Sequence, residues 1–321
     1  MEASKSLSGL LSKIFPARSQ RKPNRAWFWF LLPSALIMLI FYFLPVVLTV
    51  LISLTNMSTI TGLDRWSWVG LENYRRILGY PDTIRKFWLT LRYVLFTLVF
   101  FNVGMALVIS LITTHIPKKA GAFFRAVWLL PRITPVVVYA FMWQIMAAAP
   151  PHGIITSMIL APLGGSTTNL IPQHPFLFIV LMNGFVGASF GMIIFTSAIE
   201  SIRKDIMVSS LVDGASILQR IRYIILPQLK WPMLFVTTYQ TLSLLTSYEH
   251  ILVLTGGNFN TEVWALWSFN LALNSYYGNF QYAMGAAITT MLVVVGLVFS
   301  LVYMRYFRFD DLVQEPKIDV L

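Results

Sequence analysis

Residues 206–227 have the sequence IMVSSLVDGASILQRIRYIILP, which is patterned and charged and lies between two long hydrophobic segments. Isoleucines recur at helical spacing in its second half, at Ile217, Ile221, Ile224 and Ile225, and predict an amphipathic helix. Asp213 is a candidate N-cap for that helix, and Gly214 can adopt a turn conformation that other residues avoid. We therefore expect a short helix, a tight turn and a second helix that ends at Pro227. The pattern alone fits a solvated connector as well as a docking surface.

The composition excludes a soluble protein. Of the 321 residues, 57% are hydrophobic and 12% are charged, and the mean hydropathy is +0.69. A soluble chain of this length cannot bury so much apolar surface, so a polytopic membrane protein is predicted. The net charge of +11 favours anionic lipid headgroups over nucleic acid as its counterpart. The sequence contains no cysteine, which excludes disulfide and thiol chemistry.

Hydrophobic segments of spanning length define the predicted architecture. The six predicted spans are Trp27–Leu54, Tyr93–Ile112, Val127–Ala147, Leu177–Ile199, Trp231–Leu254 and Tyr282–Met304. Residues 263–304 are uncharged and too long for one crossing, so Val263–Asn274 is predicted to dip into the outer surface. A short amphipathic helix is expected at Asn73–Leu78. The fold class is therefore all-α.

The distribution of charge predicts the orientation. An even number of spans places both termini on one side, and the basic residues Lys118, Lys119, Arg125 and those within Arg203–Lys230 fall on that side. The loops after the third and fifth spans contain no Lys or Arg. Because basic loops remain in the cytoplasm, we expect cytoplasmic tails at residues 1–25 and 309–321. The loop after the first span has five basic residues, but its acids nearly balance them.

Polar residues form two stripes inside predicted spans. Asn183, Gly187 and Gly191 share one face of the fourth span, and Gln240, Ser243 and Ser247 share one face of the fifth. Small and polar residues at such positions either pack helices together or line a pathway. Both interpretations remain open at this point.

The sequence lacks the motifs of a catalyst. It contains no Gly-x-x-x-x-Gly-Lys-Ser/Thr loop, so any ATP and Mg²⁺ must be bound by another subunit. Its four histidines show no metal-ligand spacing, and no nucleophile–base arrangement is evident. We therefore predict a protein that is not itself an enzyme.

Five motifs in order carry a resemblance to a known family. They are Val69–Tyr74 (VGLENY), Phe124–Pro131, Asp213-Gly214-Ala215 followed by Ile224-x-Leu226-Pro227, Leu254–Gly257 (LTGG) with Thr261, and Phe280–Met284 (FQYAM). Together they resemble permease subunits of binding-protein-dependent ABC importers of the maltose and glycerol-phosphate type, over roughly residues 27–308. The resemblance implies a permease domain at residues 26–308 with an EAA-type coupling helix pair at about 203–228.

The resemblance assigns a role to the opening stretch, with one departure. In that family the EAA loop forms two short helices that sit in a cleft of the cytoplasmic ATPase. The implied coupling residues are Val208, Ser209, Ser210, Asp213, Gly214, Ala215, Leu226 and Pro227. Val208 stands where the family has Glu, so we expect docking by shape, by apolar contact and by Asp205 or Arg220, unless a second permease subunit carries the stronger half of the coupling.

The resemblance also implies a substrate pathway. Asn183 and Gly187 match the family's sugar-contacting residues in type, and Phe190 falls at an aromatic position. Gln240 and Ser247 occupy equivalent positions without matching, and Ser243 lies on the same stripe. Arg92, Arg132 and Glu249 lie at or near membrane depth and are candidate contacts for a gate or for an acidic, uronate-type cargo. Snorkelling to the interface is the simpler explanation for Arg92.

These inferences predict the permease subunit of an ATP-driven importer of a sugar or oligosaccharide. The expected partners are a second permease subunit, two cytoplasmic ATPase subunits, an extracytoplasmic binding protein, the sugar and membrane lipids, and nucleic acid is not expected. The expected location is the bacterial inner membrane, with the chain multi-pass and without a cofactor of its own. The alternative is a self-contained ion-coupled carrier of a small polar solute, which predicts paired carboxylates at mid-membrane. No predicted span has an acidic residue at its centre.

Overall fold

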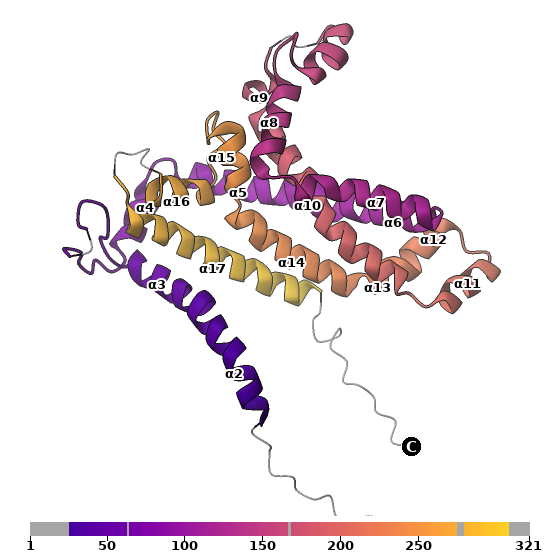
Figure 1. The fold of residues 1–321 in the computed structure, drawn as a ribbon, viewed down its shortest axis with the longest axis horizontal. Coiled ribbons are helices and arrows are strands. Elements are labelled where there is room, and N and C mark those ends of the chain that lie inside the picture. Colours follow the sequence, from indigo (N-terminus) through magenta and orange to yellow (C-terminus); the bar gives the residue numbers. More distant parts are fainter. Residues whose placement is uncertain (1–25, 63, 166–167, 275–278, 308–321) are drawn as a thin grey trace, which may run out of the picture. The chain divides into compact units, whose positions relative to one another are not determined.

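The computed structural model describes residues 26–62, 64–165, 168–274 and 279–307 (Figure 1). Within these ranges the chain is helical and has no strand beyond a single bridge between Thr55 and Trp68. The all-α prediction is confirmed for this part of the chain, whereas the predicted tails 1–25 and 309–321 lie outside the described residues. The chain divides into two units, Met1–Leu48 and Thr49–Leu321.

The first unit holds most of the first predicted span. It contains α2 (Ala26–Met38), a π-helical segment at Leu39–Phe43 and the start of α3 (Leu44–Ser53). Pro45 lacks an N–H group and its ring crowds the carbonyl group four residues earlier, which accounts for a widened turn just before it. Phe28–Ser53 is long and apolar enough to cross a membrane.

The second unit contains the remaining spans. Thr83–His115 is one long helix made of α5 (Thr83–Phe96), a π-helical segment at Thr97–Met105 and α6 (Ala106–His115). It begins ten residues before the predicted start of the uncharged span at Tyr93, and Lys86 in its first turn is paired and buried. The other long apolar helices are α10 (Pro175–Glu200) and α17 (Tyr282–Tyr306).

Two predicted spans are interrupted. The third consists of α7 (Lys118–Ile133) and α8 (Val136–Ala147), which meet at an angle of 100° across Thr134 and Pro135. The fifth consists of α14 (Lys230–Thr246) and α15 (Glu249–Thr255). By length and composition, the described residues include four helices that can cross a membrane, or five if α7 and α8 form one span.

Shorter helices complete the unit. The predicted amphipathic helix at Asn73–Leu78 is confirmed as α4 (Glu72–Gly79). The segment Val263–Asn274 is helical as predicted, over α16 (Trp264–Ala272), and most of its side chains are buried in the protein. A loop between α8 and α10 contains a π turn (Ile155–Leu160), a 3₁₀ turn (Ala161–Leu163) and α9 (Leu170–Gln173).

Glycines let α10 cross the Thr83–His115 helix at close range. Gly184, Gly187 and Gly191 face its π-helical segment, and a Cβ atom at any of them would lie within 3.0 Å of Phe101 or Asn102. Larger side chains at these positions would therefore force the two helices apart. The stripe predicted on the fourth span is a packing surface over at least its glycine positions.

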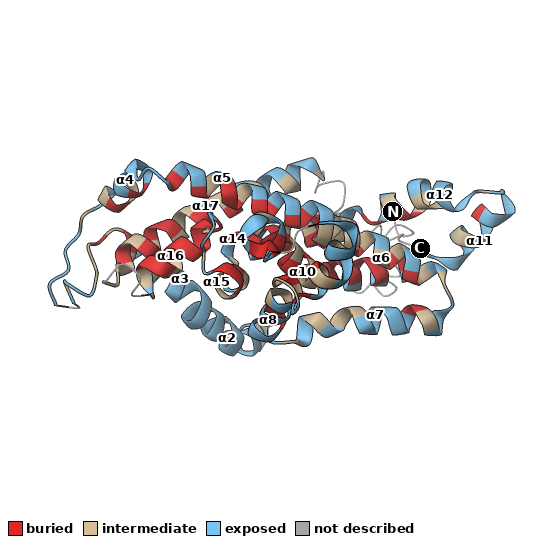
Figure 2. Ribbon diagram, turned by 90° about the horizontal axis from the view of Figure 1, so that it is seen from above, coloured by how far each residue is buried: buried red, intermediate tan, exposed pale blue. Residues whose placement is uncertain are grey.

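The core of the second unit is uneven along its length. Its largest cluster surrounds α16 and includes Tyr93, Trp264 and Leu266, all nearly inaccessible to solvent. A much smaller cluster, built on Ile199 and Ile225, supports the opposite end, where α11 (Lys204–Val212) and α12 (Ile217–Arg220) lie. Figure 2 shows buried residues gathered around α16 and exposed ones along α11 and α12.

Candidate functional site

The turn between α11 and α12 is fixed by backbone hydrogen bonds. Gly214 has a φ of +73°, and its N–H donates to the Leu211 carbonyl oxygen at 3.1 Å. The Ala215 N–H donates to the Ser210 carbonyl oxygen at 2.9 Å. This pair of bonds is a Schellman motif, which ends a helix at a glycine in the left-handed conformation. The turn is therefore specified by Gly214 rather than by a contact with the rest of the chain.

The second helix of this hairpin is capped by a serine. The Gln219 N–H donates to Ser216 Oγ at 3.3 Å, and the Ser216 N–H donates to Gln219 Oε1 at 2.7 Å, which completes a capping box. The prediction that Asp213 is the N-cap is therefore wrong: Asp213 is the C-cap of α11. Asp213 still belongs to the four-residue turn.

The helix also continues past Pro227, where the sequence predicted its end. A π-helical segment (Ile221–Ile225) follows α12 and leads into α13 (Leu226–Gln228), and α14 begins at Lys230. Pro227 lies in α13 directly after the π-helical segment, and such a widened turn accompanies the loss of an N–H donor inside helical backbone. The hairpin is thereby joined to a membrane helix by almost continuous helical backbone.

The apolar residues of the hairpin divide into two sets. Ile221, Ile224 and Ile225 pack on the small cluster around Ile199, but Ile217 does not share their face and is exposed. Together with Leu211, Val212 and Leu218 it forms what we call the apolar cap, of which Val212 is 83% exposed and Leu218 79%. Exposed apolar clusters of this kind mark surfaces that contact another protein or a membrane.

The remaining predicted coupling residues lie on or beside the hairpin. Val208, Ser209 and Pro227 are exposed, Ala215 and Leu226 are half-buried, and Ser210 is buried with its Oγ donating to the Met207 carbonyl oxygen at 2.7 Å. The nearby carboxylate of Asp205 accepts hydrogen bonds from Arg203, which lowers the pKa of that carboxyl group. Asp205 is thus already engaged within the chain.

The predicted pathway residues of the fourth and fifth spans meet through hydrogen bonds. Asn183 Nδ2 donates to Ser247 Oγ at 3.1 Å and also to the Tyr93 hydroxyl group. Gln240 Nε2 donates to the Gly187 carbonyl oxygen at 2.9 Å. Asn183 and Gln240 are buried, whereas Ser243 is exposed. In this conformation these amides link α10, α14 and α5.

Phe190 lies on a different face, beside Arg132. The Phe190 ring stacks on Tyr239 with a centroid distance of 4.7 Å, and Tyr239 stacks on Phe235 at 6.2 Å. The guanidinium carbon of Arg132 lies 5.5 Å from the centroid of the Phe190 ring. The structure therefore brings together two residues that the sequence had placed in separate groups.

The other charges at membrane depth do not meet. Arg92 is exposed and its Nε donates to the Trp88 carbonyl oxygen at 3.4 Å, which agrees with snorkelling. Glu249 is exposed at the start of α15. Within the described ranges, no ion pair joins Arg92 to Glu249.

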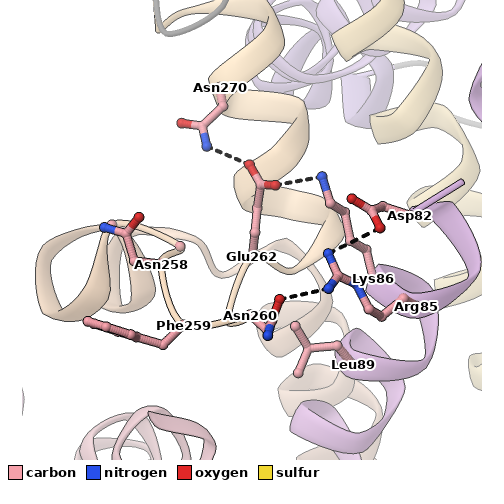
Figure 3. Close-up of a pocket in the computed structure, with 11 residues that line it drawn as sticks. Asp82, Arg85, Lys86, Leu89, Asn258, Phe259, Asn260, Glu262 and Asn270 are labelled. Atoms are coloured by element: carbon pink, nitrogen blue, oxygen red, sulfur yellow. Dashed lines mark hydrogen bonds and ion pairs between the residues drawn. The ribbon is translucent and has the colours of Figure 1, made fainter. Parts of the chain in front are cut away.

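A polar cavity of about 330 Å³ lies at the end opposite the hairpin, between α5 and the loop after α15 (Figure 3). Lys86 Nζ and Glu262 Oε2 form an ion pair of 2.6 Å there, with side chains 9% and 18% exposed. Asn270 Nδ2 donates to the other oxygen of Glu262 at 2.7 Å, and Lys86 Nζ lies 4.4 Å from the Trp267 ring centroid. These contacts fix the loop firmly to two helices.

Sequence reasoning missed this cavity. It treated Asp82, Arg85 and Lys86 as part of a balanced surface loop and assigned no role to Glu262. The one available signal was the position of Glu262 at the edge of the uncharged stretch 263–304, where a lone acid needs a partner. Nothing in the local pattern indicated which base would supply it.

The fold and the site define a polytopic membrane protein with a helical hairpin at one end and a polar cavity at the other. The family model described as "Binding-protein-dependent transport system inner membrane component" matches residues 105–308. The chain belongs to this family of membrane transport components.

Relatives and solved structures extend the comparison over most of the chain. The "Trehalose/maltose transport system permease protein MalF" of Thermococcus litoralis is 30% identical over 284 residues, covering 87% of this chain and 92% of that protein. The "Trehalose transport system permease protein SugA" of Mycobacterium tuberculosis is 24% identical, covering 90% and 91%. A chain of a bacterial ABC transporter "involved in the import of the acidic polysaccharide alginate" has a TM-score of 0.74 at 21% identity, covering 88% and 96%. At that identity the structural match establishes a shared fold.

Proposed function

We propose that this chain is the permease subunit of an ATP-driven ABC importer for a sugar or oligosaccharide. Its relatives carry names that refer to trehalose, maltose and arabinooligosaccharides, which support a saccharide cargo. The chain pairs with a second permease subunit, two ATPase subunits that bind ATP and Mg²⁺, and an extracytoplasmic binding protein. It performs no catalysis itself.

The observation that carries this proposal is the hairpin with its apolar cap. Its turn is held by hydrogen bonds of its own, and its second helix leads into α14 with only Leu229 between them. Such a protrusion can transmit rigid-body movement of a docked ATPase to a membrane helix. With Val208 in place of an acid and Asp205 engaged by Arg203, docking depends on shape and apolar contact.

The proposed topology has six crossings and two cytoplasmic termini. The crossings are α2–α3, α5–α6, α7–α8, α10, α14–α15 and α17. Lys118 at the start of α7, Arg125 and the basic residues around the hairpin lie at the same end of the second unit, which supports a cytoplasmic location for that end. The domain limits are 1–25 and 309–321 for the tails and 26–308 for the permease domain.

The proposed pathway contains Asn183, Gly187, Phe190, Gln240, Ser243 and Ser247. In the present conformation the side-chain amides of Asn183 and Gln240 are both occupied: Asn183 donates to Ser247 Oγ and to the Tyr93 hydroxyl group, and Gln240 donates to the Gly187 carbonyl oxygen. Movement of α14 relative to α10 would release their donors toward a saccharide. Arg92 and Glu249, near the opposite end from the hairpin, are assigned to a gate or to contact with the binding protein.

The variant Gly214→Pro tests the coupling role. Proline holds φ near −65°, far from the +73° of Gly214, and lacks the N–H that donates to Leu211. We expect ATP hydrolysis stimulated by the binding protein to fall by about tenfold or more, since an incompatible proline costs more than about 1 kcal/mol locally. The purified complex of this chain with its co-purifying subunits, reconstituted in lipid, is the sample.

The matched control is Gly164→Pro. Gly164 also has a positive φ (+71°), and its N–H donates to the Ala161 carbonyl oxygen at 3.1 Å, but it lies in the loop between α8 and α10. Stimulated hydrolysis should survive this change. Normal stimulation in Gly214→Pro would remove the hairpin from the coupling role, and uptake by the chain alone under an ion gradient would establish the secondary carrier instead.

A further inference from the structure

Arg132 lies deep along its helix. It is in the last turn of α7, which begins at Lys118, so it lies about 21 Å from the start of that helix at 1.5 Å per residue. The sequence had placed it only five residues into the span from the cytoplasmic side. A guanidinium group at such depth marks a functional site by default, because leaving it there is costly.

Arg125 provides an internal comparison two turns earlier on the same face of α7. Its Nη2 pairs with Glu200 at 3.2 Å, and its Nη1 donates to the Thr113 carbonyl oxygen at 3.3 Å. Arg132 has neither kind of partner within the described ranges, and the ring of Phe190 is its contact. Glu200 therefore neutralises Arg125 near the start of α7, whereas no acidic group of the described residues neutralises Arg132.

The helices that face Arg132 supply no acid to neutralise it. The helix α7 packs on α6, which contains no acid, and on α10, whose single acidic residue is Glu200, already engaged by Arg125. The helix α14, which supplies the Tyr239 ring beside Phe190, contains no acid either. The helix C-terminus offers partial negative charge to Arg132, but a partial charge does not satisfy five N–H donors. The guanidinium is exposed and free to bind an anion.

The surface beside Arg132 is aromatic rather than plain aliphatic. Phe190 stacks on Tyr239 and Tyr239 on Phe235, with Tyr239 48% and Phe235 51% exposed. One turn before Arg132, the indole N–H of Trp128 is buried without a hydrogen-bond partner within the described residues. Flat rings suit the apolar face of a pyranose, and a guanidinium suits a carboxylate through two parallel hydrogen bonds.

We propose that Arg132, Phe190 and Tyr239 form a subsite for a carboxylate-bearing sugar, so that the cargo of this permease is an acidic saccharide. The sugar ring stacks on the aromatic pair and its carboxylate pairs with Arg132. This inference rests on the proposed function. An acidic side chain of the second permease subunit is the competing partner for Arg132, and the experiment below distinguishes it from a sugar carboxylate.

The test is uptake by the full complex, purified with its co-purifying subunits and reconstituted in proteoliposomes with its binding protein. The probes are short oligomers of galacturonate, mannuronate and glucuronate, and the neutral sugars maltotriose and trehalose. We expect uptake of an acidic probe by the wild type. In Arg132→Gln that uptake should fall by about thirtyfold or more, because truncating one partner of a hydrogen-bonded charge pair leaves the sugar carboxylate unpaired in the bound state.

Two variants sharpen the result. Arg132→Lys keeps the charge but loses the paired hydrogen bonds, so its uptake of the acidic probe should lie between those of the wild type and Arg132→Gln. Arg125→Gln removes a base that is already neutralised and should not select between acidic and neutral probes. Size-exclusion chromatography of each complex shows whether the subunits remain together.

Every other outcome overturns a defined part of the argument. Uptake of no saccharide by the wild type overturns the proposed function itself. Uptake of neutral sugars only, or an equal loss for both classes in Arg132→Gln, overturns the acidic subsite while leaving the importer intact. Dissociation of the complex in Arg132→Gln shows that Arg132 pairs with a partner subunit and also overturns the subsite.

Discussion

At the end of the second unit that carries α16, the charged side chains of Lys86 and Glu262 are buried and paired, whereas at the end that carries α11 and α12 the apolar cap is exposed. Figure 2 shows the exposed residues along α11 and α12. At the first end, the buried charges of Lys86 and Glu262 neutralise each other within the chain. At the second, the turn is rigid but its apolar cap is left uncovered. The difference teaches that the buried ion pair at the first end is completed within the chain, whereas the apolar cap at the second end is half of an interface.

The largest effect is expected from Glu262→Gln, which breaks the completed end. Lys86 would keep its charge in a site that is 9% exposed, and loss of one partner of a buried pair costs about 3–5 kcal/mol. The free energy of unfolding of the purified subunit in mixed micelles is the measurement. Adding Lys86→Met should restore much of the loss, and an unchanged free energy for Glu262→Gln alone would show that the pair is dispensable.

The double variant Val212→Asp, Leu218→Asp should show the opposite pattern. Both residues are exposed, so the stability of the isolated subunit should change by less than about 1 kcal/mol. Charges at the centre of an apolar interface are unfavourable, and we expect capture of the ATPase subunits on a tagged chain to fall by about tenfold, or about 1.4 kcal/mol. Full capture would show that the apolar cap faces something else.

A smaller effect is expected from Ser216→Ala, which tests whether hydrogen bonds within the hairpin, including the Ser216–Gln219 capping box, hold its turn in place. Loss of the serine cap should destabilise α12 by about 1 kcal/mol. Hydrogen exchange at the Gln219 amide should quicken accordingly. The exposed Ser209 in α11 is the control, and its change to alanine should leave that exchange rate unaltered; equal rates in both variants would place the rigidity elsewhere.

The smallest effect is expected from Asp82→Asn, at the rim of the polar cavity. Asp82 pairs with Arg85 at 3.2 Å, but both side chains are half exposed, and such surface pairs contribute less than about 1 kcal/mol. The same micelle unfolding assay compares it directly with Glu262→Gln. A loss as large as that of Glu262→Gln would mean that the whole cavity, rather than its buried pair, holds this end together.

Much of the fold was accessible from local patterns. Apolar runs located the long helices. The helices α4 and α16 were predicted close to their observed limits because their signals, amphipathic spacing in α4 and an uncharged segment in α16, lie within the helices themselves. The hairpin was recognised from Gly214 and the spacing of isoleucines. Its N-cap was misassigned to Asp213 because the Ser216-x-x-Gln219 capping box, which is also a local signal, was overlooked.

The remainder depends on residues that are distant in the chain. No local pattern links Lys86 to Glu262, and the predicted span began ten residues after the start of the helix at Thr83 because only the uncharged stretch was counted. The depth of Arg132 was misjudged because α7 begins at Lys118, where two adjacent lysines had been taken for a loop. The candidate pathway was proposed from position and type alone, and its pairing of Asn183 with Ser247 and of Gln240 with Gly187 required the crossing of two helices.

The apolar cap has a consequence for the life of the chain before it is assembled. In the proposed topology, a newly inserted subunit would present Val212, Leu218 and their neighbours to the cytosol with nothing covering them. Exposed patches of this kind are aggregation liabilities, so an orphan subunit is at risk until its partner arrives. We expect the chain to be short-lived when produced alone and to be rescued by co-production of the ATPase. The four exposed side chains of the apolar cap would then make balanced synthesis of the subunits necessary.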